Sequence, residues 1–217
     1  MSDNKEDPPT VVITGGTGGI GWNSAVGIAK TGAKVVITGR NKERGEEAVK
    51  KIIDETGNSN ISLVVGDVSS FDGIDALAKN LLEETNGKIS VLINNAGYLG
   101  DELKKSSDGL EMHFAVNVAS PWRLTLALLP ALKKAEEGRV IIVTGGDEVP
   151  GPAVDVDNLQ CEKSFEGLVT YGHSKSIAES MAMALADKLK PEGVLVNVIF
   201  PGRASTAMTG SLPLKWP

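Results

Sequence analysis

Tyr171 and Lys175 are the residues whose types and spacing first suggest proton chemistry. Residues 171–189 predict a helix, and residues four apart lie on the same helix face. A free tyrosine has a pKa near ~10, but a neighbouring ammonium favours the phenolate and should lower that pKa. The pair could therefore pass a proton to or from a substrate oxygen. Surface helices often carry the same spacing without any catalytic role. Whether this pair is catalytic therefore depends on the elements that surround it.

A glycine-rich segment near the N-terminus is the second candidate site. The apolar run 11–13 leads into a turn and then into a helix-like stretch. In such a unit glycines allow a tight turn and a close approach of backbone to a pyrophosphate, while amides at the helix start face the phosphates. Because a strand comes before and a helix after, the segment predicts dinucleotide binding. The candidate contacts are Gly15, Thr17, Gly18, Gly19, Ile20 and Gly21.

The end of the second expected strand indicates which dinucleotide is bound. A site for NAD usually places Asp or Glu about 20 residues beyond the turn, on the ribose hydroxyls. Here the strand ends in Thr38, Gly39, Arg40 and Asn41, without a carboxylate. Arg40, with Asn41 beside it, could bind a 2′-phosphate through charge-assisted bonds, which favours NADP(H) over NAD(H). The alternative for Arg40 is a solvated arginine at the sheet edge.

Alternating apolar and amphipathic stretches predict the elements that position these residues. Six short β-branched runs predict buried strands at residues 10–14, 34–38, 61–65, 89–93, 139–143 and 194–200. Helices are clearest at 43–55, 74–84, 124–136 and 171–189, and glycines fall near expected helix ends at Gly32, Gly57, Gly87, Gly138 and Gly193. This alternation predicts an α/β fold with a doubly wound, Rossmann-type parallel sheet. We expect one domain over residues 10–217, after a disordered polar tail at 1–9.

Composition narrows the class of function. The chain has 217 residues, 41% of them hydrophobic and 23% charged, as in ordinary globular proteins. Its net charge of −6 gives no electrostatic reason to bind nucleic acid or an anionic membrane. Cys161 is the only cysteine, so no internal disulfide forms, and with two histidines it makes no metal site. Without an apolar run long enough to cross a bilayer and without a signal-peptide core, we expect a cytoplasmic protein with no transmembrane segment.

Six motifs in order resemble those of the short-chain dehydrogenase/reductase family, over nearly the whole chain. They are the TGxxxGxG turn at Thr14–Gly21, Asp67 with Val68, the NNAG segment Asn94, Asn95, Ala96 and Gly97, the helix asparagine Asn117, the YxxxK pair Tyr171 and Lys175, and Pro201 with Gly202 and the following Thr206. An insert at 157–163 and the HSK of residues 173–175 resemble the retinol-dehydrogenase-like branch.

The resemblance implies a role for each motif. Asp67 and Val68 would lie around the adenine, Asn94, Ala96 and Gly97 would follow the fourth strand beside the cofactor, and Pro201, Gly202 and Thr206 would hold the nicotinamide end. Lys175 would bind the nicotinamide ribose while the cofactor carries hydride. Asn117 would hold a water that relays protons to Lys175; the alternative is a buried asparagine that satisfies backbone groups. Many relatives pair subunits through helices like 110–132 and 174–189, so a homodimer or homotetramer is implied.

Two departures from the family pattern stand out. The serine that follows the fifth strand in relatives falls on Gly145, or on Gly146 if one residue is inserted. Thr144 is the nearest hydroxyl, and we keep it as a candidate, although one step along a strand points to the other face. Losing such a donor could cost roughly 3–4 kcal/mol of transition-state stabilisation. Family members continue beyond Thr206 into a lid helix and a seventh strand, so we expect the fold to lack that strand; either the sequence is truncated or the pocket is unusually open.

The leading hypothesis is an NADP(H)-dependent oxidoreductase that interconverts a carbonyl and an alcohol on a small, mostly apolar substrate. Tyr171 would donate or accept the proton. The substrate or a water molecule could supply the hydrogen bond of the missing serine hydroxyl. Alternatively, Thr144 could turn its hydroxyl into the site at the strand end, or Asp147 could act as an acid in place of the serine. The alternative is an NADP(H)-binding protein with impaired or non-redox activity, such as a regulator, an epimerase or a dehydratase.

Overall fold

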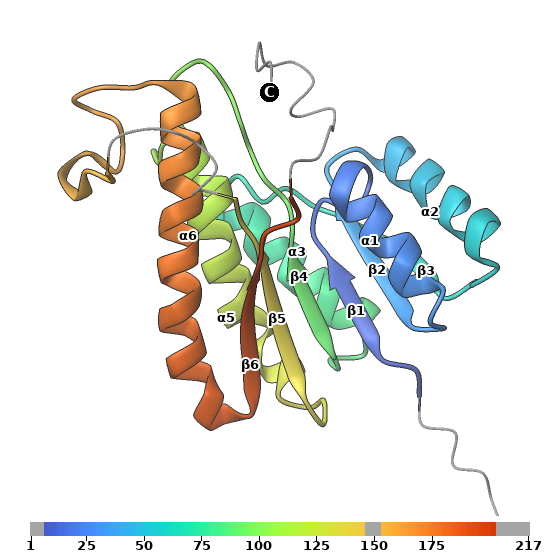
Figure 1. Ribbon diagram of the computed structural model, residues 1–217. Helices are drawn as coiled ribbons and strands as arrows, with labels where there is room; N and C mark the ends of the chain where they lie inside the picture. Colours follow the sequence, from blue (N-terminus) through green and yellow to red (C-terminus); the bar gives the residue numbers. More distant parts are fainter. Residues whose placement is uncertain (1–6, 146–152, 203–217) are drawn as a thin grey trace, which may run out of the picture.

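All six strands predicted from β-branched runs are present, and they lie in one parallel sheet (Figure 1). The computed structural model describes residues 7–145 and 153–202. The strands are β1 (Thr10–Ile13), β2 (Lys34–Gly39), β3 (Ile61–Val65), β4 (Val91–Asn94), β5 (Gly138–Val143) and β6 (Val194–Ile199). Their order in the sheet is β3-β2-β1-β4-β5-β6, and every pairing is parallel. The predicted Rossmann-type sheet is therefore confirmed.

The helices begin earlier than their apolar periodicity predicted. They are α1 (Gly19–Ala29), α2 (Lys42–Thr56), α3 (Phe71–Glu84), α4 (Met112–Phe114), the π-helical η1 (Ala115–Ala119), α5 (Ser120–Leu132), η3 (Val156–Asn158), α6 (Gly167–Leu189) and η4 (Lys190–Glu192). Capping sets two of these starts. The Asn41 side chain accepts a hydrogen bond from the Arg44 amide, and the Ser70 side chain accepts one from the Gly73 amide. The prediction of a helix at 124–136 was displaced, since α5 begins and ends four residues earlier.

The glycines expected at helix ends divide into two kinds. Gly57 and Gly193 adopt left-handed φ angles of 70° and 78° just after α2 and η4, as predicted. The prediction for Gly138 was wrong, because this residue begins β5. A Cβ there would overlap the Leu132 carbonyl, so close passage of the strand past the end of α5 accounts for the glycine.

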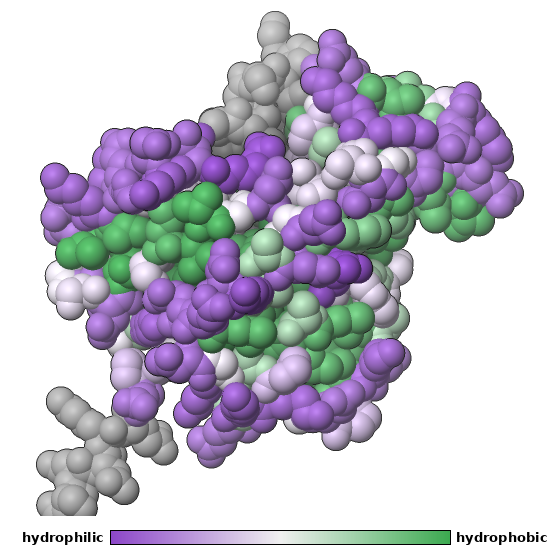
Figure 2. Space-filling view, turned by 180° about the vertical axis from the view of Figure 1, so that it is seen from behind, coloured by the Kyte–Doolittle hydropathy of each residue, from purple (hydrophilic) through white to green (hydrophobic). Residues whose placement is uncertain are grey.

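Two helical layers cover the sheet. Helices α1 and α2 pack on one face, and α3, α5 and α6 on the other (Figure 1). Neighbouring strand residues alternate between the layers, with Val12 packed in the α3, α5 and α6 cluster and Ile13 in the α1 and α2 cluster. Hydrophilic and hydrophobic residues are interspersed over the rear of the molecule (Figure 2). Among the described helices, none combines the length and the apolar character that spanning a membrane requires.

Candidate active site

The candidate residues gather at the carboxyl edge of the sheet. β1 and β4 are neighbours in the sheet. From β1 the chain crosses to β2 on one side, and from β4 it crosses to β5 on the other, so the direction of the crossovers reverses between β1 and β4. In open α/β sheets ligands bind in the crevice at this switch point. The glycine turn follows β1, and the NNAG segment begins at Asn94, the last residue of β4. α6 brings Tyr171 and Lys175 to the end of β5.

The glycine turn has the geometry expected for a phosphate site. Gly15 has a left-handed φ of 66°, and a Cβ there would lie 3.0 Å from Ala96 Cα. A Cβ on Gly21 would overlap the Gly15 carbonyl, so only glycine lets α1 pack this close to the turn. Gly18 precedes α1 and supplies no side-chain cap. The amides of the first turn are therefore left for an anion.

Asn95 joins the glycine turn to the segment after β4. Its side-chain amide donates to the Thr14 carbonyl at 2.8 Å and to the Gly15 carbonyl at 3.2 Å. The Thr14 hydroxyl in turn accepts from the backbone amides of Asn95 and Ala96, each at 3.0 Å. Asn94, by contrast, is 6% exposed and turns its amide toward Thr125 of α5. The prediction named Asn94 and left out its neighbour Asn95, although both stand in the NNAG motif.

Two arginines lie near the turn at the end of β2. Arg40 is exposed, while Asn41 uses its side-chain oxygen to cap α2 at the Arg44 amide, 2.7 Å away. The Arg44 Nη2 atom lies 2.8 Å from where a Cβ on Gly18 would stand, so this guanidinium rests against the glycine turn. Neither arginine forms an ion pair within residues 7–145 and 153–202. Sequence reasoning missed Arg44, although its place in the first turn of the helix that follows Arg40 was a usable signal.

The remaining predicted cofactor contacts lie along the same edge. Asp67 is exposed, and its carboxylate accepts from the Ser69 amide at 2.9 Å; Val68 packs into the core. Thr17 lies against Gly39, where a Cβ would come within 2.6 Å of its methyl group. Gly97 follows Ala96 in the loop after β4, and Pro201 and Gly202 are exposed after β6. Thr206, Gly146 and Asp147 lie outside the described residues.

Tyr171 and Lys175 lie on one face of α6, as the spacing predicted. Lys175 Nζ is 5.8 Å from the centre of the Tyr171 ring. The lysine is 5% exposed, and its ammonium donates to the Val143 carbonyl at 3.0 Å. This bond ties the Tyr171 and Lys175 pair to the carboxyl end of β5.

Burial changes the acidity of both groups. It lowers the pKa of Lys175 from 10.5 to about 8, against an opposing effect of the Glu179 carboxylate. It raises the pKa of Tyr171. The prediction of a lowered tyrosine pKa is therefore wrong, because burial of the Tyr171 ring outweighs any stabilisation of its phenolate by the Lys175 ammonium. At neutral pH Tyr171 is a phenol that can donate a proton.

Asn117 lies in the π-helical turn η1, a local geometry often found at functional sites. Its side-chain oxygen accepts from the Tyr98 amide at 2.8 Å. Its side-chain nitrogen donates to the Tyr98 carbonyl at 3.0 Å and to Ser174 Oγ at 2.8 Å. These contacts match the alternative of a buried asparagine that satisfies backbone groups, and they tie the loop after β4 to α6. The water relay stays a prediction.

The end of β5 shows what stands at the family's serine position. Gly145 has a φ of 150°, and a Cβ there would contact the Phe200 ring at 3.4 Å. Thr144 is 4% exposed, and its hydroxyl has no hydrogen-bond partner among the described residues. A buried hydroxyl without a partner costs free energy, so this oxygen is a candidate for a bond that the described residues do not supply.

Comparison with known proteins points to one family. Residues 9–215 match the family model described as short chain dehydrogenase. Retinol dehydrogenase 11 of Homo sapiens is 35% identical over 198 residues, which are 91% of this chain and 62% of that protein. Dehydrogenase/reductase SDR family member 12 of Bos taurus is 37% identical over 165 residues, covering 76% of this chain and 51% of that protein. The chain thus spans about three fifths of the length of the retinol dehydrogenase it matches.

Solved structures resemble the fold over nearly its full length. The "Pseudomonas aeruginosa RhlG/NADP active-site complex" superposes with a TM-score of 0.77 and 27% identity, over 94% of this chain and 76% of that one. A "Short-chain dehydrogenase from Sphingobium yanoikuyae in complex with NADPH" superposes with a TM-score of 0.72 and 25% identity, over 95% and 78%. Both descriptions name the phosphorylated dinucleotide.

Proposed function

Because this chain belongs to the short-chain dehydrogenase family, we propose that it is an NADP(H)-dependent oxidoreductase that interconverts a carbonyl and an alcohol. One observation carries the proposal. Tyr171 and Lys175 share a face of α6, and the Lys175 bond to the Val143 carbonyl holds them at the carboxyl edge of the sheet. A proton donor thus stands where the fold binds its ligands.

The residues at this edge fit a phosphorylated dinucleotide. The start of α1 without a side-chain cap suits the pyrophosphate, and Arg40 and Arg44 suit a 2′-phosphate. When bound, the cofactor supplies the hydride. The two relatives described with NADP or NADPH support this choice.

Tyr171 performs the proton transfer. During reduction its phenol donates a proton to the carbonyl oxygen as the carbonyl carbon receives hydride; during oxidation its phenolate removes the alcohol proton. The Lys175 ammonium, 5.8 Å from the ring centre, stabilises the phenolate. Asn117 positions α6 through Ser174.

The substrate class is a mostly apolar ketone or aldehyde. The relatives named retinol dehydrogenases make retinal and retinol a probe pair, beside a panel of simple aldehydes and ketones. We expect purified protein to oxidise NADPH faster than NADH with at least one of these carbonyls. Absence of turnover in both directions with both cofactors would overturn the proposal.

Arg40→Ala and Arg44→Ala are each expected to weaken NADP(H) binding roughly tenfold to a hundredfold, since a hydrogen bond to a charged group contributes about 1.5–3 kcal/mol. NAD(H), which lacks the 2′-phosphate, should bind with nearly unchanged affinity. Calorimetric titration of both cofactors measures the difference. Lys42→Ala is the matched control, because this exposed cation stands between the two arginines in the sequence and is paired with Glu46. Equal losses for NADP(H) and NAD(H) would refute the 2′-phosphate contact.

A second function follows from the end of β5. Gly145 offers no hydroxyl to a substrate, and the Thr144 hydroxyl is buried. These observations favour a cofactor-binding protein whose redox chemistry is weak, or which uses a donor from its substrate.

Comparing Gly145→Ser with Gly145→Ala isolates the missing hydroxyl. At a φ of 150° either side chain introduces backbone strain, so both variants should lose about 1–3 kcal/mol of unfolding free energy. Only serine adds a donor, and we expect it to reduce a carbonyl roughly 10²–10³ times faster than the alanine variant. Steady-state rates and denaturant unfolding measure the two effects. Equal rates for the two variants would show that the reaction has no use for a hydroxyl here.

A further inference from the structure

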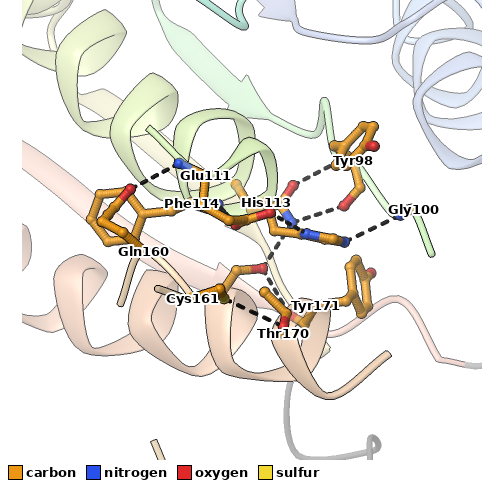
Figure 3. Close-up of polar contacts among 11 residues, drawn as sticks. Tyr98, Gly100, Glu111, His113, Phe114, Gln160, Cys161, Thr170 and Tyr171 are labelled. Atoms are coloured by element: carbon orange, nitrogen blue, oxygen red, sulfur yellow. Dashed lines mark hydrogen bonds and ion pairs between the residues drawn. The ribbon is translucent and has the colours of Figure 1, made fainter. Parts of the chain in front are cut away.

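Two fully buried polar side chains lie beside Tyr171 (Figure 3). Glu111 and His113 are both 0% exposed, and His113 Nδ1 is 2.7 Å from Glu111 Oε1. Burying a carboxylate and an imidazole costs free energy unless hydrogen bonds compensate. Hydrogen bonds to Glu111 and His113 must therefore compensate for their burial.

The hydrogen bonds define the protonation of the pair. Burial opposes the ionisation of Glu111 most strongly, but hydrogen bonds from the His113 ring and from the amides of His113 and Phe114 together outweigh it, and the Glu111 pKa is lowered. The carboxylate therefore accepts the His113 Nδ1 proton. The Gly100 amide donates to His113 Nε2 at 3.1 Å, which requires a lone pair on that nitrogen. The network thus assigns His113 the neutral form with its proton on Nδ1.

The same imidazole contacts the proton donor from the side. In Figure 3 the His113 ring lies between Tyr98 and Tyr171, with ring centres 4.9 Å and 6.5 Å away and both pairs edge-to-face. Phe165 lies 6.0 Å from it. Aromatic pairs at these distances favour defined relative orientations. The ring of His113 therefore restricts where the Tyr171 ring can lie.

A second route runs through the backbone. The bond from Gly100 to His113 holds the loop after β4, and Gly167 at the start of α6 packs directly against that loop. A Cβ on Gly167 would lie 2.5 Å from the Gly100 carbonyl and 2.9 Å from Asp101 Cα. Tyr171 follows one helical turn after Gly167. The loop that His113 holds thus sets the position of the helix start that carries Tyr171.

We propose that His113, oriented by Glu111 and accepting from the Gly100 amide through its unprotonated Nε2, is a positioning residue that holds Tyr171 for proton transfer. The inference rests on the proposed function, in which Tyr171 carries the proton. His113 acts through its ring contact and through Gly100, and it does not take part in the transfer itself.

Two amide substitutions separate the two bonds of the imidazole. His113→Gln can place an amide oxygen where Nε2 lies, so it can keep the acceptor for Gly100. His113→Asn can place an amide nitrogen where Nδ1 lies, so it can keep the donor to Glu111 and lose the Gly100 acceptor. Since a misplacement of about 1 Å can cost about a hundredfold in rate, we expect His113→Asn to lose tenfold to a hundredfold in kcat. His113→Gln should retain more activity, with NADP(H) affinity unchanged in both.

A readout without turnover is possible because the chain has two tyrosines, Tyr98 and Tyr171. In a Tyr98→Phe background, the ultraviolet absorbance of the phenolate reports Tyr171 alone, read just after a pH jump. His113→Asn in this background should lower the Tyr171 pKa toward ~10, because the loosened ring regains solvent. His113→Gln should shift it less. If His113→Asn does not fold, Glu111→Gln replaces it: an amide can donate to Nδ1, which moves the proton to Nε2 and breaks the Gly100 bond.

The outcomes distinguish this inference from the function beneath it. A wild-type chain with no activity that depends on Tyr171 overturns the proposed function. An active wild-type chain whose kcat and Tyr171 pKa are the same in the substituted proteins overturns the positioning role alone. A folded His113→Asn protein with reduced kcat and a lowered Tyr171 pKa supports both.

Discussion

Tyr171→Phe is expected to lower kcat for carbonyl reduction roughly 10²–10⁴-fold, the usual contribution of a positioned general acid. Phenylalanine keeps the ring that packs edge-to-face against His113 and removes only the group that gives up the proton. The fold and the glycine turn should be unaffected. Steady-state kinetics at saturating NADPH measure the loss.

Two controls make that result specific. NADP(H) affinity and thermal unfolding of Tyr171→Phe should match the wild type within error, since neither depends on the phenol proton. A variant that binds cofactor and still reduces the carbonyl at the wild-type rate would show that another group donates the proton.

Lys175→Met is expected to raise the unfolding free energy near neutral pH while it lowers kcat. A lysine pKa lowered from 10.5 to about 8 corresponds to about 3 kcal/mol of unfavourable charge burial, less what the bond to the Val143 carbonyl returns. Methionine is of similar length and needs no hydration. Activity should fall because the Tyr171 phenolate loses its neighbouring charge. Chemical denaturation and steady-state rates measure the two opposite effects.

The pH dependence gives this prediction a sign. Between about pH 8 and 10.5 the unfolded chain keeps the Lys175 proton while the folded chain has released it. The unfolded state then binds more protons, so wild-type stability should rise with pH across this window through Lys175. Lys175→Met should lack that rise. Lys188→Met, at an exposed position on the same helix, is the matched control and should retain it. A wild type and a Lys175→Met variant with parallel curves would refute the prediction.

The order of elements and the local shape of the site could be predicted from sequence because both depend on neighbouring residues. Strand and helix periods of the apolar residues predicted the parallel sheet. The same-face placement of Tyr171 and Lys175 follows from helix geometry alone, and the tight turn at Gly15 follows from its backbone freedom. Helix starts were less accurate, since the caps Asn41 and Ser70 and the packing of Gly167 on Gly100 lie outside the apolar pattern.

What only the tertiary structure decided rests on contacts between distant segments. Only the folded chain decides which of two adjacent asparagines reaches the glycine turn: Asn94, at the end of β4, bonds to Thr125 of α5, whereas Asn95 bonds to the turn. Arg44 is a candidate for the 2′-phosphate because its guanidinium lies against Gly18, a contact that depends on how α2 packs beside the glycine turn. The Tyr171 pKa rises because folding removes water from the ring, an effect that helix spacing cannot report. The sequence excluded His113 from a metal site and indicated no other role for it. Its contact with Tyr171 exists because α4 and α6 meet, and the two residues are 58 positions apart along the chain.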